Sequence, residues 1–176
     1  MMRPEDYLTH PEIFEYRVFP TAEIPFSPAV VEACERNVCG MYGKRWTCPP
    51  GVGTLETLSG RIRAFPNALL VSYKYDLEDS FDFEGMTEGR RRAKAAFGSM
   101  TDAMRAAGER FLAFGSEGCE LCERCTYPDA PCRFPDRASP AVEACGINVM
   151  QLAKNLGMRY NNGVAVTYFC MVVWGE

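Results

Sequence analysis

The sequence has little of three features on which whole classes of protein depend. Its 176 residues include one histidine, His10, so histidine-based catalysis and a mixed Cys/His zinc site have almost no support. The formal net charge is −4 and the pI about 5.2, which argues against a nucleic-acid surface. No long apolar run follows the N-terminal charges or occurs later, so neither a secretory signal nor a membrane span is predicted. We therefore expect a cytoplasmic protein that binds neither nucleic acid nor membranes.

Two cofactor signatures are also missing. Gly51-Val52-Gly53 lacks the third glycine of a dinucleotide loop and follows cysteines rather than a strand, so nucleotide binding is not predicted. Neither cysteine group has three and then two residues between its cysteines, the spacing that signals radical chemistry on S-adenosylmethionine.

Cysteine, in contrast, is abundant. The chain has nine cysteines, and seven of them fall into two tight groups. In a reducing cytosol, metal or redox chemistry explains so many thiols better than disulfides do, and an odd count cannot pair completely within one chain. The length suits one domain, and we predict a single cysteine-rich metal-binding domain over residues 1–176.

The second cysteine group predicts an iron–sulfur site. Cys119, Cys122 and Cys125 recur at every third residue, so that one short loop can point three sulfurs at a compact [4Fe–4S] cluster. Cys132, which returns after a stretch with two prolines, is the predicted fourth ligand. Six residues separate it from Cys125, unlike the bacterial ferredoxin run, so a fourth ligand from elsewhere stays open. Four thiolates could instead hold a structural zinc ion, which is the simpler alternative.

The first group, Cys34, Cys39 and Cys48, could hold a second cluster with one iron ligated from a distance or left open for chemistry. The alternative is that one or two of these cysteines are buried hydrophobic residues. Cys48 could also be the fourth ligand of the triplet. Of the two remaining cysteines, Cys145 is kept as a candidate ligand of the first group, and Cys170, inside a predicted strand, is expected in the core.

The hydrophobic patterns alternate between helix and strand. We predict an α/β layered fold with a central sheet of about four strands flanked by helices, and with cysteine-rich loops that carry the metal site. The run at 68–75 is expected to have one face better covered than the other, whereas the last strand is expected to be central and covered on both faces. The predicted strands are 13–19, 68–75, 111–114 and 164–174. Of the four predicted helices, one begins at Ser27, one begins at Thr54, one runs through 93–107 and one runs from 139 to 157.

Three blocks of sequence carry a family resemblance: Cys34 to Pro50, Cys119 to Pro135 and Ser139 to Val149. Together they resemble the signature blocks of domain-of-unknown-function family 2284, which is described as predicted metal-binding, cysteine-rich proteins typical of anaerobes. The resemblance implies that both cysteine groups belong to the family pattern. Cys34 and Cys39 are spaced more widely than that pattern, and Asn148 stands where aspartate is usual. The family implies no reaction.

The leading hypothesis is an iron–sulfur protein that carries electrons to or from a redox partner protein through one [4Fe–4S] cluster or two. The alternatives are an enzyme or metal-delivery accessory with an open iron site at the first group, and a zinc-stabilised interaction module. A basic patch of Arg90, Arg91, Arg92 and Lys94 is interpreted as a solvated face, with docking of an acidic redox partner as the alternative.

Overall fold

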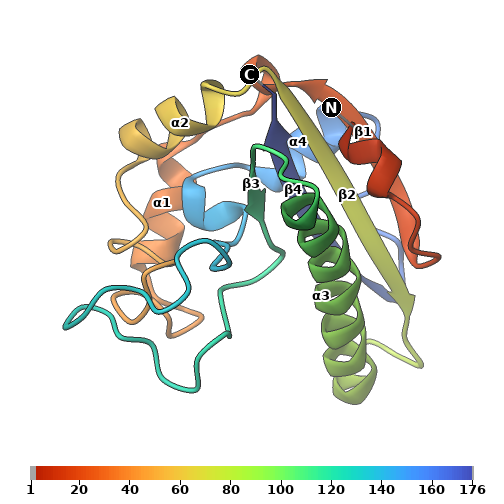
Figure 1. Cartoon of the computed structure of the whole chain (residues 1–176). Helices are drawn as coiled ribbons and strands as arrows, with labels where there is room; N and C mark the ends of the chain where they lie inside the picture. The colour runs from red at the N-terminus through yellow and green to blue at the C-terminus, as the bar shows by residue number, and fades with distance from the viewer. Residues whose placement is uncertain (1–2, 176) are drawn as a thin grey trace.

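The computed structural model describes residues 3–175, in which four antiparallel strands form one sheet with helices on both faces (Figure 1). Along the sheet the order is β1-β2-β4-β3, so β2 and β4 are central and the other two strands are edges. β2 and β4 pair along their whole length, from Asn67 opposite Trp174 to Asp76 opposite Ala165. The strands are β1 (Ile13–Pro20), β2 (Asn67–Asp76), β3 (Phe111–Phe114) and β4 (Ala165–Trp174).

Alternate residues of the central strands face two separate halves of the core. In β2, Ala68 and Leu70 pack towards one layer of helices, while Leu69 and Val71 pack against α3 (Phe83–Ala106). This division follows from the period of two in a strand. Helices on both faces leave almost no β2 side chain exposed. Near the end of the strand the two faces differ as expected: Tyr73 and Tyr75 are buried, whereas Lys74 is only partly buried and Asp76 is exposed. The expectation that one face of this strand is better covered than the other is confirmed there.

The helices fall into two layers. The long helix α3 covers one face, where Tyr7 and Leu8 also pack, and Gly89 allows the close approach of α3, because a Cβ there would lie 2.8 Å from the Tyr75 ring. The opposite face is covered by shorter elements, which Figure 1 shows on the other side of the sheet from α3. These shorter elements are α1 (Pro28–Glu35), α2 (Leu55–Arg63), the 3₁₀ turn η3 (Glu143–Cys145) and α4 (Val149–Asn155). The chain also has two 3₁₀ turns nearer its N-terminus, η1 (Pro4–Tyr7) and η2 (Thr21–Glu23).

The predicted α/β fold is confirmed, and most elements lie where the patterns place them. β3 has the predicted bounds, β4 is central and covered on both faces, and α2 begins after Thr54, whose hydroxyl accepts the N–H of Thr57. α3 begins ten residues before the stripe that predicted it, after Asp82, whose carboxylate accepts the N–H of Gly85 at 2.8 Å.

One predicted helix is wrong. Residues 139–157 do not form a continuous helix, because the chain turns at Gly146, whose φ of 76° is left-handed. Asn148 then starts α4 by accepting the N–H of Gln151 at 3.0 Å. The apolar residues of the predicted stripe still lie in the core. The pattern therefore predicted correctly which residues are buried, but not that the helix is interrupted.

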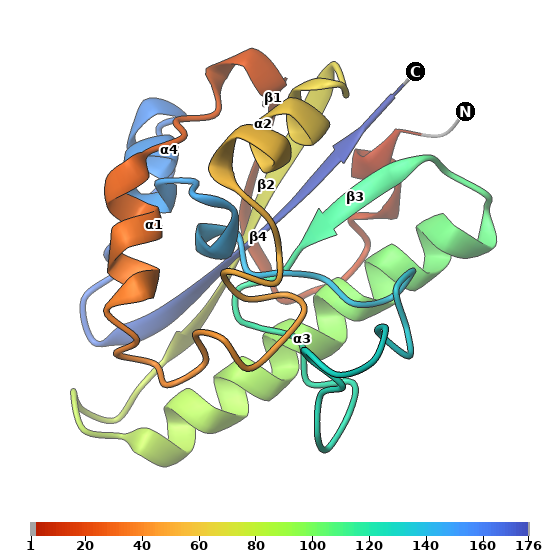
Figure 2. The ribbon, with the colours of Figure 1, turned by 90° about the vertical axis from the view of Figure 1, so that its left-hand side faces the viewer.

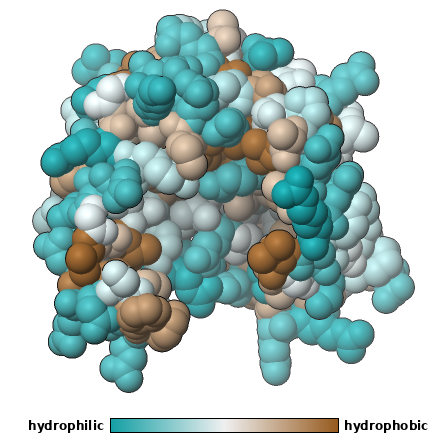
Figure 3. Space-filling model, turned by 180° about the vertical axis from the view of Figure 1, so that it is seen from behind, coloured by the Kyte–Doolittle hydropathy of each residue, from teal (hydrophilic) through white to brown (hydrophobic). Residues whose placement is uncertain are grey.

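Both cysteine-rich segments lie outside the sheet. Figures 1 and 2 show the loop between α1 and α2 side by side with the loop that follows β3, at one end of the molecule. Figure 3 shows a mostly hydrophilic face with hydrophobic side chains in separate patches. Within residues 3–175, no helix combines the length and the apolar character needed to cross a bilayer.

Candidate metal centre

The loop that carries the second cysteine group is closed at its base by backbone pairing. The Gly115 N–H donates to the Pro140 carbonyl at 2.8 Å, and the Val142 N–H donates to the Gly115 carbonyl at 3.0 Å. Gly115 and Ala141 form an isolated parallel bridge there. Residues 116–139 are therefore a loop whose two ends are both held at the sheet.

All four thiols of this loop line one small cavity of about 230 Å³. Each of the four is partly buried. The opposite wall comes from the loop between α1 and α2, so the cavity lies between the two cysteine-rich segments. It is lined by Met41, Lys44, Arg45, Trp46, Thr47, Cys119, Cys122, Glu123, Arg124, Cys125 and Cys132.

Backbone N–H groups are directed at the sulfur of Cys125. Partial burial raises the pKa of this thiol, but N–H groups of Tyr127, Trp46 and Thr126 donate to the sulfur and outweigh that effect, so the pKa is lowered. Because a metal binds the thiolate, this environment prepares Cys125 as a ligand. Hydrogen bonds to sulfur also help to set the reduction potential of iron–sulfur centres.

Arg45 places a positive charge beside the thiols. It lines the thiol cavity, and a Cβ at Gly118 would lie 3.2 Å from its Nη1 atom and 3.6 Å from the Cys48 sulfur. Burial raises the pKa of both Cys48 and Cys119, and the Arg45 charge opposes that increase at each. A guanidinium here offsets part of the negative charge of clustered thiolates.

Trp46 joins the two cysteine-rich segments. Its indole Nε1 donates to the Ala130 carbonyl at 3.0 Å, and its ring meets Tyr127 edge-on at 4.9 Å between centroids. Gly51 lies at the same junction, because a Cβ there would be 2.7 Å from the Tyr127 ring and 2.8 Å from the Arg45 carbonyl oxygen. The wall of the thiol cavity is thus packed against the loop that carries the thiols.

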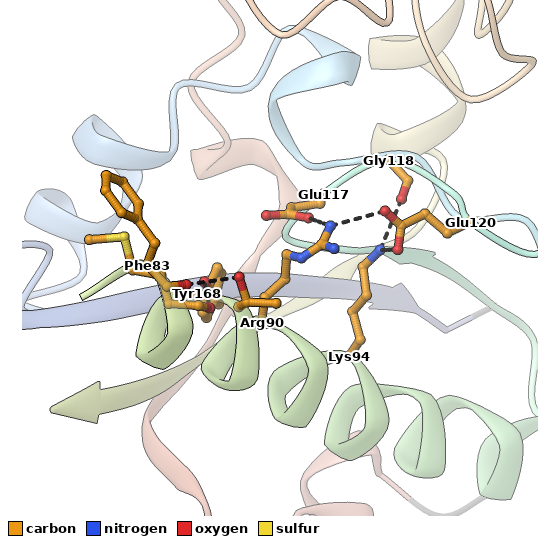
Figure 4. Close-up of polar contacts among 9 residues, drawn as sticks. Phe83, Arg90, Lys94, Glu117, Gly118, Glu120 and Tyr168 are labelled. Carbon is orange, nitrogen blue, oxygen red and sulfur yellow. Dashed lines mark hydrogen bonds and ion pairs between the residues drawn. The ribbon is translucent and has the colours of Figure 1, made fainter. Parts of the chain in front are cut away.

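Two cations of α3 contact the residues on both sides of Cys119 (Figure 4). Arg90 Nη1 contacts the carboxylates of Glu117 and Glu120 at 2.8 and 2.9 Å. Lys94 Nζ contacts Glu120 at 2.7 Å and the Gly118 carbonyl at 3.3 Å. We call Arg90, Lys94, Glu117 and Glu120 the α3 clamp. It fixes the backbone on both sides of Cys119 to a rigid helix.

The rest of the predicted basic patch is also paired within the chain. Arg91 contacts Glu88 at 2.6 Å, one turn away on the same helix, and Arg92 pairs with Glu12. The four cations therefore do not form a free positive surface.

The first cysteine group adjoins the same region through Cys48. Cys34 lies in the last turn of α1, Cys39 is exposed, and Cys48 is buried beside the second loop. Burial, followed by the neighbouring Cys39 and Cys48 thiols, raises the pKa of the Cys34 thiol. Cys48 is also close enough to Cys119 for the two thiols to interact electrostatically. Cys48 thus stands between the two groups.

The two remaining cysteines are buried in the framework. Cys145 is fully buried in η3, and burial raises the pKa of its thiol to about 12. Cys170 is 1% exposed in β4, with its thiol pKa likewise raised to about 12 by burial. Cys145 interacts electrostatically with Cys34, whereas Cys170 faces the α3 layer, as expected of a core residue.

Comparison with known protein families matches residues 17–174 to domain-of-unknown-function family 2284, described as a predicted metal-binding protein. The chain belongs to this family. The match covers nearly the whole sequence, from β1 to the end of β4, and so includes both cysteine groups of this family 2284 member. Searches of curated proteins and of solved structures found no match.

The donor set suits the metal-binding description of family 2284. Thiolates select zinc and iron–sulfur centres, and here four of them share one cavity with donors aimed at sulfur. Within residues 3–175, no three Cys, His, Asp or Glu side chains converge closely enough to hold a metal ion. Ligation would therefore draw the loop inward, so that binding and local ordering are coupled. The individual ligand assignments stay predictions.

Sequence reasoning missed the supporting residues of this family 2284 site. Arg45, Trp46 and Thr47 line the thiol cavity, and Thr47 Oγ1 accepts the Cys119 N–H at 3.4 Å. Their only signal is their position between Cys39 and Cys48, because the contacts that give them a role span more than 70 residues. The α3 clamp was missed in the same way: its cations were recognised, but their partners were not.

Proposed function

We propose that this protein is an iron–sulfur protein in which Cys119, Cys122, Cys125 and Cys132 hold a [4Fe–4S] cluster that exchanges electrons with a redox partner protein. The observation that carries the proposal is the single cavity that all four thiols line. When bound, such a cluster supplies one-electron exchange. The chain supplies the ligands, the N–H groups directed at Cys125, the Arg45 charge and the partial burial that together tune the potential. A reducing compartment such as the cytoplasm suits the free thiols.

Zinc is the competing occupant. Four thiolates also form a closed zinc site, but such sites usually take two separated pairs rather than a triplet at every third residue. The hydrogen bonds at Cys125 suit a thiolate ligand of either occupant, and in an iron–sulfur centre they would also help to set the potential.

A second candidate function rests on the first cysteine group. Cys34, Cys39 and Cys48 interact electrostatically and lack an obvious fourth thiol, apart from the fully buried Cys145. A metal held by these three would keep an open position, which suits an enzyme or a metal-delivery accessory. Exposure of Cys39 favours this candidate, since an open position must be reached from solvent.

Metal analysis tests both candidates. The protein is purified without oxygen, and iron, acid-labile sulfide and zinc are measured per chain. About four irons and four sulfides support one cubane cluster, and about eight of each support two. Stoichiometric zinc without sulfide would replace the proposal with a zinc-stabilised module. Spectral change on adding cyanide or carbon monoxide would indicate an open iron position.

A further inference from the structure

A second, larger cavity of about 900 Å³ lies beside the thiol cavity. This volume is within the range of about 300–1,000 Å³ that is typical of small-molecule sites. Its wall comes mainly from α2, the strand β3 and the stretch 128–140 of the second cysteine loop, and is completed by residues of the loop before α2 and of the end of α3. Its apolar wall includes Leu58, Ile62, Phe111 and Phe114.

The two cavities share a wall. Cys132, Trp46 and Thr47 line both of them. Trp46 is held in that wall by its hydrogen bond to the Ala130 carbonyl. A molecule in the larger cavity would therefore contact a predicted metal ligand without entering the thiol cavity.

The edge of the sheet also faces this cavity. β3 is the last strand of the sheet, and among residues 3–175 its named strand partner is β4, while the next residue, Gly115, forms a single bridge to Ala141. The outer edge of Phe111–Phe114 has no strand partner within those residues. At an open edge, backbone N–H groups can donate hydrogen bonds to a ligand and carbonyl groups can accept them. The cavity thus combines an apolar wall with a few polar groups, which is the usual composition of a ligand site.

Arg61 supplies a positive charge from α2. It is exposed, and no hydrogen bond or ion pair within the described chain engages its guanidinium. The other cation of the wall, Arg105, is already engaged: it contacts Asp102 at 2.9 Å and the Asp136 carbonyl at 3.1 Å, and it lies over Phe111. Acidic residues line the cavity too, at Glu109, Asp129 and Asp136, and they come from the β3 and loop walls rather than from α2.

We propose that this cavity binds a small organic anion with an apolar, ring-sized body, whose charged group pairs with Arg61. The apolar body would lie against Leu58, Ile62 and Leu112, which line the cavity on the same face of the sheet. The site would bring this molecule into contact with Cys132. The binding step itself depends on the cavity alone; only a redox role for the ligand rests on the proposed function.

The test uses 2-naphthoate and its uncharged analogue 2-naphthamide as probes. Titrations of the complete protein are followed by calorimetry and by the NMR signal of the Trp46 indole N–H, which Trp46→Phe assigns. We expect 2-naphthoate to bind, to shift the Trp46 signal and to bind about tenfold or more tightly than the amide, because a charge-assisted pair with arginine is lost in the amide. Equal affinities, or no binding of 2-naphthoate, would overturn the proposal.

Two variants on α2 sharpen the test. Arg61→Gln should reduce the affinity for 2-naphthoate about tenfold and leave that for 2-naphthamide unchanged. Arg63→Gln is the matched control, because Arg63 lies on the same helix but stacks over Phe26, outside this cavity. Equal losses for both variants would show a general charge effect and contradict the assignment of Arg61.

Metal content is measured on the same samples. Charge-selective binding by a chain that contains no cluster would leave the cavity assignment intact and remove the iron–sulfur function. A loaded cluster without charge-selective binding would support the iron–sulfur function and overturn the assignment of the cavity as an anion site.

Discussion

At the scale of single residues, the thiols divide into those that a metal can reach and those that the framework buries. Cys122 lines the thiol cavity, whereas Cys170 is buried between β4 and α3. Substitution of Cys122 should change the metal content, whereas substitution of Cys170 should change the stability, since a ligand contributes to metal content and a core residue contributes to packing.

Replacing Cys122 by alanine should abolish the bound metal and its absorbance, because one of four predicted ligands is lost. Cys170→Ala is the matched control: it should keep the metal content but lower the free energy of unfolding by roughly 1–2 kcal/mol, as truncation of a small buried side chain does. Metal analysis and urea unfolding separate the two effects. Full metal content in Cys122→Ala would remove this residue from the ligand set.

Gly51 is a residue at which a single methyl group should disturb the junction of the two cysteine segments. Gly51→Ala would force the new Cβ against the Tyr127 ring and the Arg45 backbone. We expect weaker metal retention and a lower melting temperature, measured by calorimetry and by metal content after dialysis.

Gly60 provides the control for this change. Apart from its chain neighbours and the backbone of its own helix, nothing in residues 3–175 lies within 4 Å of the position that a Cβ would take, and residue 60 is inside α2. Gly60→Ala should therefore raise the free energy of unfolding by about 0.5–1 kcal/mol through helix propensity. A similar loss of metal in both variants would contradict a specific role for the junction.

At the scale of elements, α3 acts as the support of the second cysteine loop through the α3 clamp. Its ion pairs are partly exposed, so each should contribute only about 0.2–1 kcal/mol. Their effect should appear in the local dynamics of the loop rather than in global stability, because they hold a segment that few other contacts reach.

Lys94→Met should accelerate hydrogen exchange at the amides of residues 117–120 by roughly two- to fivefold, since it removes one contact to Glu120 and one to the Gly118 carbonyl. Arg91→Gln is the matched control, because Arg91 forms its ion pair with Glu88 on its own helix and does not contact the α3 clamp in the part of the chain that the structure describes. Equal exchange rates in Lys94→Met and the unaltered protein would mean that the clamp does not hold the loop. A shift in reduction potential without loss of metal would further separate electrostatic tuning from simple unfolding.

Elements were also the scale at which sequence patterns performed best, and their failures have local causes. β3 and β4 were predicted within about one residue because alternation and apolar runs mark them directly. The first turns of α3 escaped notice since Gly85 and Gly89 lower helix propensity, although Asp82 caps the helix. The break at Gly146 depends on a left-handed φ that no hydrophobic period reveals. For the site, spacing grouped the thiols, but Arg45 and Trp46 gained their roles through contacts distant in sequence.

At the scale of the whole molecule, burial on both faces of the sheet makes stability sensitive to high pH. The buried Cys170 thiol keeps its proton up to a pKa of about 12, while the unfolded chain loses it near the ordinary value of 9.0. The folded state therefore binds more protons in this window. The stability contributed by the neutral thiol is complete below about pH 9 and is lost as the pH rises towards 12.

Urea unfolding between pH 8 and 11 should show this loss. Cys170→Ala should flatten the decrease by up to about 1.4 kcal/mol per pH unit, the contribution of one proton, while Cys145 maintains part of the remaining slope. Parallel slopes for Cys170→Ala and the unaltered protein would rule out this thiol as the titrating group.

The place of β4 in the chain has a consequence for how a metal centre is assembled during synthesis. β4 holds β2 and β3 together, yet it follows both cysteine groups in the sequence. At synthesis rates of about 5–20 residues per second, Cys132 emerges several seconds before the strand that completes the sheet. The thiols are thus exposed to their surroundings before the sheet that supports them has formed. Metal insertion should follow the appearance of β4 rather than the appearance of the cysteines, and in the interval the exposed thiols depend on the reducing power of their surroundings.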